Sequence, residues 1–197
     1  MDVLSDAELF DMVRMGDKKA LSTLFVRYYD QLYHFGCRIT QREILVEESI
    51  QELFIYIFES HTRLSKVQNV KAYLFRSFQR RLLLQLNKER KISNAEDIDS
   101  HQQEFFFLAE DFLLKESQQS QSLAAILNEL PWQQREAIYL RYYNNLSTKE
   151  IAEVMGLANQ TVLNTLYIVL KKVRKKLGLR ELIILLIPLA RLASHFS

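Results

Sequence analysis

Glycine and proline are scarce in this chain, which has four Gly and two Pro among 197 residues. A β-rich fold reverses direction at many tight turns, and those turns depend heavily on glycine and proline. The sequence therefore predicts an all-α fold. Its composition, 48% hydrophobic and 25% charged, is ordinary for a globular protein and argues against global disorder.

Charge is distributed unevenly along the chain, although the formal net charge is only +2. Residues 1–92 hold 15 basic and 12 acidic side chains, residues 93–121 hold one and seven, and residues 122–197 hold ten and five. The acidic middle segment is also rich in Gln and Ser, as linkers often are. We therefore expect two small helical domains, 5–92 and 122–178, an acidic linker over 93–121, and an apolar tail over 179–197.

The sequence contains no recognisable catalytic constellation or metal-binding motif. Its four histidines are isolated, its single cysteine excludes an internal disulfide, and it has no glycine-rich phosphate loop. We expect no enzyme activity, no cofactor, no metal ion and no small-molecule substrate. Cys37 is interpreted as a buried small apolar residue, with redox sensing as the alternative.

The character of the N-terminus and the length of the longest apolar run lead us to expect a cytoplasmic location. The acidic N-terminus does not have the pattern of a signal peptide. The longest apolar run, Leu182 to Ala190, is about half the length of a membrane-spanning helix.

Apolar residues recur at three- and four-residue steps through the first basic block, which indicates amphipathic helices. One run extends from Leu21 to Phe35, a second from Ile50 to Phe58, and a third from Val70 to Arg90. Asp17 is placed to cap the first run, and Gly16 could serve that start equally well. Residues 61–69 have no apolar period and are predicted to form a loop.

The second basic block has the layout of a helix-turn-helix. Ser147 and Glu150 predict a capping box for a short helix over 148–155, and Gly156 permits the left-handed turn that follows. A longer helix is predicted from about 159 to 177. The residues expected to pack inside are Ala152 between the helices, Leu157 in the corner, and Val162 and Leu166 on the core side.

The longer helix carries polar residues at its start and basic residues at its end. Such residues suit base edges in the major groove and phosphates, respectively. The predicted DNA contacts are Gln160, Thr161, Asn164, Thr165, Lys171 and Lys172. An ordinary helical hairpin with a solvated basic end is the alternative interpretation.

Several segments resemble the sigma-70 family, in its extracytoplasmic-function (ECF) class. LNELPWQQREAIYLRYYNNLSTKEIAEVMGLANQTVLNTLYIVLKKVRKKL closely resembles region 4, and GDKKALSTLFVRYYDQLYHF, VEESIQELFIYIF and NVKAYLFRSFQRRLLLQLNKERK look like region 2. The resemblance implies a factor that binds core RNA polymerase, recognises promoter DNA and initiates transcription. It also implies an anti-sigma factor as a partner, often membrane-bound in this family.

The resemblance assigns VEESIQELF to polymerase binding, through Glu48, Gln51, Glu52, Leu53 and Phe54. Its stripe of acidic and apolar residues suits a partner helix. A solvated face over a core is the alternative, and Leu53 and Phe54 are expected in the core in either case.

The third run of the first block interleaves basic and aromatic residues, a combination suited to capturing single-stranded DNA. By resemblance it recognises and melts the minus-10 element. The predicted contacts are Lys66, Asn69, Lys71, Tyr73, Arg76, Arg80 and Arg81. Tyr73 stands where the family usually has Trp, and Phe75 and Phe78 are interpreted as core residues.

The recognition helix departs from the family pattern TVKSRLxRAR, because Leu163, Thr165 and Ile168 replace basic residues. The helix then reads the minus-35 element through its neutral polar residues, or binds it weakly, or meets a protein partner through Leu163 and Ile168. A helical adaptor that binds proteins without reading DNA is the rival function.

The apolar tail lies outside the family's two domains. It folds back on region 4, for instance near residues 105–108, or binds a regulatory partner, or rests at a membrane surface. The sequence leaves these three interpretations open.

Overall fold

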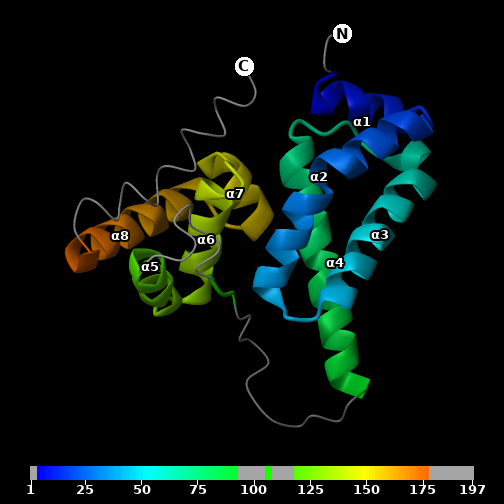
Figure 1. The fold of residues 1–197 in the computed structure, drawn as a ribbon. Coiled ribbons are helices and arrows are strands. Elements are labelled where there is room, and N and C mark those ends of the chain that lie inside the picture. The colour runs from blue at the N-terminus through cyan, green and yellow to red at the C-terminus, as the bar shows by residue number, and fades with distance from the viewer. Residues whose placement is uncertain (1–3, 93–104, 108–117, 178–197) are drawn as a thin grey trace. The chain divides into compact units, whose positions relative to one another are not determined.

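The computed structural model describes residues 4–92, 105–107 and 118–177. The chain divides into two compact units, residues 1–100 and 101–197 (Figure 1). All regular elements of the described residues are helical, which confirms the all-α prediction. Within those residues, no helix has the length and apolar character needed to cross a membrane. The tail and most of the expected linker lie outside the described ranges.

The first unit contains α1 (Asp6–Arg14), α2 (Lys18–Ile39), α3 (Glu43–Glu59), the short 3-10 helix η1 (His61–Arg63) and α4 (Val70–Ile92). Ser5 and Glu8 form a capping box at the start of α1. Of the two candidate caps, Asp17 and not Gly16 caps α2, because the Asp17 carboxylate accepts hydrogen bonds from the Lys19 and Ala20 amides at 2.7 and 3.1 Å.

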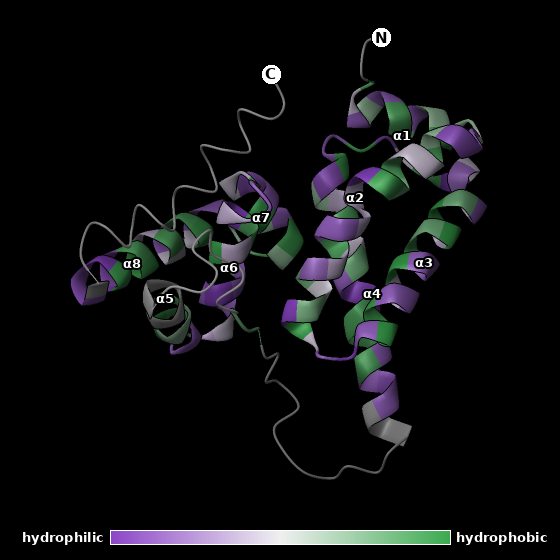
Figure 2. Ribbon diagram, viewed as in Figure 1, coloured by the Kyte–Doolittle hydropathy of each residue, from purple (hydrophilic) through white to green (hydrophobic). Residues whose placement is uncertain are grey.

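The core of the first unit forms around α2, which packs against α1, α3 and α4. Apolar residues recur along one side of each helix (Figure 2). Phe35 of α2 is fully buried, with its ring centroid 5.3 Å from that of Phe75 and 6.3 Å from that of Phe78 on α4. The interpretation of Phe75 and Phe78 as core residues is therefore confirmed.

The helices of this core approach one another most tightly at Gly36. A Cβ atom added there would lie 2.6 Å from Cγ1 of Val46 and 2.8 Å from Cζ of Phe78. Both of those side chains are fully buried, so neither has free space to move into. Gly36 is therefore required by the packing of α2 against α3 and α4.

The second unit contains α5 (Gln118–Asn128), α6 (Trp132–Tyr142), α7 (Thr148–Met155) and α8 (Asn159–Leu177). Ser147 and Glu150 make the predicted capping box, and Gly156 has the left-handed conformation with φ of +66°. Pro131 is the N-cap of α6.

The second unit also includes a segment of the expected linker. Phe105 and Phe107 are each 2% exposed, and their rings pack on Tyr139 with centroids 5.3 and 6.0 Å away. The Asn128 side chain accepts a hydrogen bond from the Phe107 amide at 2.8 Å and donates one to its carbonyl at 2.9 Å. Burial of these aromatic rings offsets the entropy of ordering the segment. The described part of this unit thus begins before residue 122.

We expect Gly36→Ala to destabilise the first unit by about 1–3 kcal/mol through overpacking. Without the steric overlap, alanine would stabilise a helix interior by about 1 kcal/mol relative to glycine, so the sign of the change is informative. Urea denaturation followed by circular dichroism measures it. Ser22→Ala, at an exposed position of the same helix, is the control and should change the free energy of unfolding by less than about 0.5 kcal/mol. A more stable Gly36→Ala variant would contradict the packing argument.

Candidate nucleic-acid and protein interfaces

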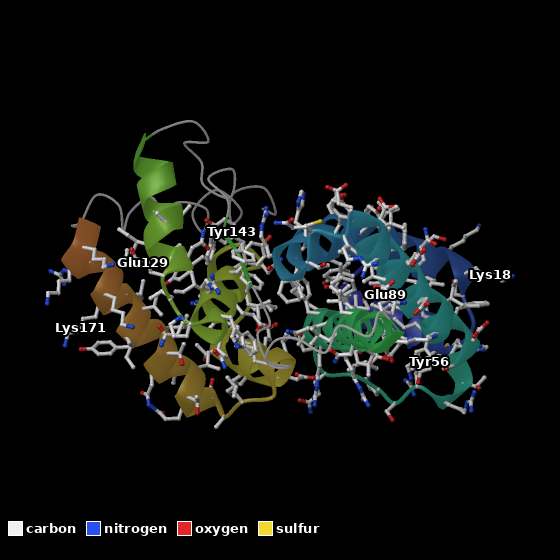
Figure 3. All side chains as sticks on the ribbon, turned by 90° about the horizontal axis from the view of Figure 1, so that it is seen from below. Lys18, Tyr56, Glu89, Glu129, Tyr143 and Lys171 are labelled. Carbon is white, nitrogen blue, oxygen red and sulfur yellow. The ribbon has the colours of Figure 1, made fainter. Side chains whose placement is uncertain are left out.

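The helix-turn-helix of α7 and α8 presents one side of α8 to solvent. Val162, Leu166, Val169 and Val173 are buried on the opposite side, which confirms the placement of Val162 and Leu166. The solvent side carries the residues predicted to contact DNA. Gln160, Thr161, Asn164, Lys171 and Lys172 are exposed and Thr165 is half-buried, and Lys171 extends outward from α8 (Figure 3).

The start of α8 offers neutral hydrogen-bonding groups. Gln160 Nε2 donates a hydrogen bond to Asn164 Oδ1 at 3.1 Å across one helical turn. This bond orients two amide side chains on the same exposed face. Amide side chains pair with adenine in the major groove, so the geometry suits base reading.

Large apolar side chains share the exposed side of α8. Leu163 is 42%, Tyr167 67% and Ile168 44% exposed. Leu157 is 39% exposed, so the expectation that it fills the corner between the helices is wrong. Leu146, Ile151 and Val154 are buried in this unit, whereas the side chain that follows the Gly156 turn lies in solvent.

The basic residues of α4 lie in different environments. Arg76 and Arg80 are exposed, opposite the side that buries Phe75 and Phe78. Arg81 is half-buried, and its guanidinium carbon lies 4.4 Å from the centroid of the Tyr56 ring. Tyr56 comes from α3 (Figure 3) and was not predicted, because its proximity to Arg81 depends on how two helices pack.

Tyr73 of α4 is half-buried. Its ring meets Phe10 of α1 edge to face, with centroids 5.4 Å apart. Burial raises the pKa of the Tyr73 hydroxyl, so this side chain stays neutral at ordinary pH. One side of the Tyr73 ring therefore packs against α1. Lys71, two residues earlier in α4, is also half-buried.

The loop over 61–69 carries the remaining predicted minus-10 residues. Asn69 has a structural role, because its Oδ1 accepts a hydrogen bond from the Ala72 amide at 2.9 Å at the start of α4. Lys66 is 74% exposed in its side chain, with Nζ 3.5 Å from Asp11 Oδ2 of α1. Lys66 is thus the more accessible of the two to DNA.

The predicted polymerase-binding residues of α3 divide into two groups. Glu48, Gln51 and Glu52 are exposed, whereas Leu53 and Phe54 are 0% and 5% exposed. Leu53 is therefore a core residue and presents no surface to a partner. Phe54 reaches the surface only as part of the wall of a cavity.

That cavity has a volume of about 590 Å³ and lies between α2 and α3. Its lining is mainly apolar and includes Leu21, Phe25, Phe54, Ile55 and Phe58, with Gln51 at its edge. Ile55, 56% exposed, is the accessible apolar residue here that the sequence did not single out. Acidic and amide groups beside an apolar hollow suit a basic amphipathic helix.

Cys37 is half-buried rather than buried as expected. Burial is the main cause that raises the pKa of its thiol, against a smaller lowering effect of the Tyr33 hydroxyl. A raised pKa lowers the thiolate fraction, which opposes redox chemistry at this position. Among the described residues, no group of three or more His, Cys, Asp or Glu is placed to hold a metal ion.

Comparison with known proteins gives consistent matches. Residues 120–173 match the family Sigma-70, region 4. The chain is 24% identical over 165 residues to the RNA polymerase sigma factor SigV of Bacillus subtilis (strain 168), covering 84% of this chain and 95% of SigV. This match extends the similarity beyond the helix-turn-helix to most of the chain.

Two solved structures share the fold. One is CnrH in complex with the cytosolic domain of CnrY, with a TM-score of 0.59 and 19% identity over 86% of this chain and 95% of that one. The other is the sigma factor RpoE in complex with the anti-sigma factor NepR from Bartonella quintana, also with a TM-score of 0.59 and 19% identity, over 80% and 96%. At this level of identity they show a common architecture.

We expect the alkylation of Cys37 by iodoacetamide to be slower at pH 8 than that of a free cysteine. The raised pKa leaves less thiolate at that pH, so the midpoint of the rate against pH should lie above that of the same thiol in the unfolded chain. Mass spectrometry of the modified protein gives the rate, and the protein unfolded in urea is the control. A folded-state midpoint below that of the unfolded chain would refute the assignment.

Proposed function

We infer that this chain, which carries a sigma-70 region 4 domain and is a distant homologue of ECF sigma factors such as SigV, is an ECF-type RNA polymerase sigma factor. The observation that carries this conclusion is the helix-turn-helix of α7 and α8, which falls inside the matched residues 120–173. Sigma factors direct transcription initiation and are not enzymes.

The proposed role of the second unit is to bind the minus-35 element through α8. Gln160 and Asn164 read base edges, and the exposed Lys171, Lys172 and Lys175 at the end of the helix contact phosphates. The first turns lack basic residues, so phosphate attraction comes mainly from the helix end. This arrangement predicts salt-sensitive binding with modest sequence preference.

The proposed role of α4 in the first unit is to bind the minus-10 element. The exposed Arg76 and Arg80 supply positive charge for the backbone. The Tyr56 ring, 47% exposed and covered on one side by Arg81, adds an aromatic surface beside Arg81. Positive charge next to an accessible ring is the combination that holds unstacked bases.

The proposed polymerase contact is the exposed face of α3. Glu48, Gln51 and Glu52 supply charge and hydrogen bonding, and the adjacent cavity accepts apolar side chains. This assignment replaces direct contact by Leu53, which is buried. The first unit would then serve as region 2, with the residues after α4 as the connection to region 4.

The solved relatives suggest one further partner. CnrH is bound to the cytosolic domain of CnrY, and RpoE is bound to the anti-sigma factor NepR. We propose that this chain also binds an anti-sigma factor, whether soluble or membrane-bound, and that it acts in the cytoplasm, where RNA polymerase is found.

A protein-binding adaptor that does not read DNA is the second candidate, favoured by the exposed Leu163, Tyr167 and Ile168 on α8. Reconstituted transcription on genomic fragments separates the two functions. A sigma factor added to core polymerase produces transcripts from defined start sites, and core polymerase alone does not. Binding to polymerase without any promoter-specific transcript would exclude the sigma function and support the adaptor.

We expect Arg76→Ala and Arg80→Ala each to weaken promoter binding by the holoenzyme without changing affinity for core polymerase. Each variant removes one exposed charge near DNA, so the slope of log K against log salt should fall by about 0.7–0.9. Fluorescence anisotropy with labelled promoter DNA measures the slope. Lys19→Ala, an exposed cation on α2, is the matched control and should leave the slope unchanged. An equal change in all three variants would contradict the placement of DNA on α4.

A further inference from the structure

The loop over 61–69 is anchored at both of its ends. At its start, the Leu64 amide donates a hydrogen bond to the Ser60 carbonyl at 3.1 Å, and the His61 ring stacks on Phe58 with centroids 5.6 Å apart. At its end, Asn69 caps α4. Leu64 begins a stretch without helical structure, residues 64–67, and contacts from other elements add to its local hydrogen bonds in fixing its position.

Arg14, the last residue of α1, provides such a contact. Its Nε donates a hydrogen bond to the Leu64 carbonyl at 2.9 Å. The same guanidinium donates a hydrogen bond from Nη1 to Asp11 Oδ1 at 3.0 Å, one turn earlier in α1. The other oxygen of that carboxylate, Asp11 Oδ2, lies 3.5 Å from Lys66 Nζ. One arginine and one aspartate therefore connect the helix to both Leu64 and Lys66.

The geometry of this contact depends on arginine. A guanidinium is planar and rigid, so a hydrogen bond from Nε and a hydrogen bond from Nη1 together fix its orientation. Because Asp11 accepts the hydrogen bond from Nη1, the direction of the Nε–H group is set, and this direction defines where the Leu64 carbonyl lies. Lysine carries the same charge but no fork, and it cannot reproduce this orientation.

The helix that carries Arg14 is itself firmly placed. Leu9, Phe10 and Val13 of α1 are at most 2% exposed, and Phe10 packs against Tyr73 of α4. α1 contacts α2, α4 and η1. The hydrogen bond from Arg14 therefore fixes the position of Leu64 relative to the core of the unit. In particular, it fixes that position relative to α4, the helix that carries Arg76 and Arg80.

We propose that Arg14 is a positioning residue for promoter recognition: with Asp11 it holds the 61–69 loop, and Lys66 on it, in register with the basic face of α4. The proposal rests on the proposed sigma function. It concerns a residue outside the DNA-contacting set, acting through the Leu64 carbonyl and the Asp11 carboxylate.

A matched control lies elsewhere in the same unit. Arg27 of α2 also joins a carboxylate and a carbonyl, those of Asp6 and Leu4, the latter at 3.0 Å. The side chains of Arg27 and Asp6 are 28% and 32% exposed, close to the 33% and 34% of Arg14 and Asp11. Within the described residues, the Arg27 side chain makes no hydrogen bond or ion pair with residues 61–69, so Arg27→Ala tests the loss of a similar pair of contacts at another place.

The experiment compares wild type, Arg14→Ala, Arg14→Lys and Arg27→Ala. In the free protein, hydrogen exchange reports the opening of amides over 61–69. In the holoenzyme, open-complex formation is measured on a duplex promoter and on point variants of its minus-10 element. We expect both Arg14 variants to exchange about 10-fold faster in the loop and to lose most of their preference among minus-10 variants. Arg27→Ala should match the wild type in both measurements, and all four proteins should bind core polymerase equally.

Two results would overturn the proposal. One is wild-type exchange and minus-10 preference in Arg14→Ala, and the other is Arg14→Lys behaving as the wild type, which would reduce the role of Arg14 to its charge. A wild-type protein that initiates no transcription refutes the sigma function itself, and that result is distinct because it is seen before any variant is compared. Circular dichroism melting of each variant identifies global unfolding, and the exchange of α2 amides serves as the internal reference.

Discussion

The close approach of α2 to α3 and α4 at Gly36 is the constraint on which the first unit depends. Without a side chain at that position, Val46 and Phe78 meet the backbone of α2 directly, and the Phe35, Phe75 and Phe78 rings fill the space around it. Since α3 and α4 each bury one side in this core, their other sides are fixed surfaces of one body. The acidic residues of α3 and the arginines of α4 are therefore presented from a common rigid support.

In the second unit, the residues that the core buries determine which side chains of α8 remain exposed. The core takes Val162, Leu166, Val169 and Val173 from α8, and an aromatic cluster of Phe105, Phe107, Tyr139 and Tyr143 packs on another side of the unit. What remains on the solvent side of α8 is a mixture of amides, apolar side chains and a basic end. In the proposed function, the basic end attracts the DNA backbone and the amide side chains at the start supply neutral contacts to bases.

Arginine serves two purposes in this protein, and its surroundings decide which. Arg76 and Arg80 are exposed and available to a polyanion. Arg14 and Arg27 each join a carboxylate to a backbone carbonyl, and Arg81 covers an aromatic ring. A count of basic residues treats all of them alike, and only part of that charge is accessible to DNA.

The sequence alone determined the helical fold, the cap at Ser147, the left-handed turn at Gly156, and the core positions of Phe75, Phe78, Val162 and Leu166. These features depend on local spacing, since a helix repeats every 3.6 residues and a cap acts within three. Tertiary structure decided that Leu157 faces solvent, that Phe105 and Phe107 join the second core, and that Tyr56 meets Arg81 and Arg14 meets Leu64. These outcomes depend on which segments come together in the folded chain. The distance between residues of different segments is set by how helices pack rather than by their separation along the chain.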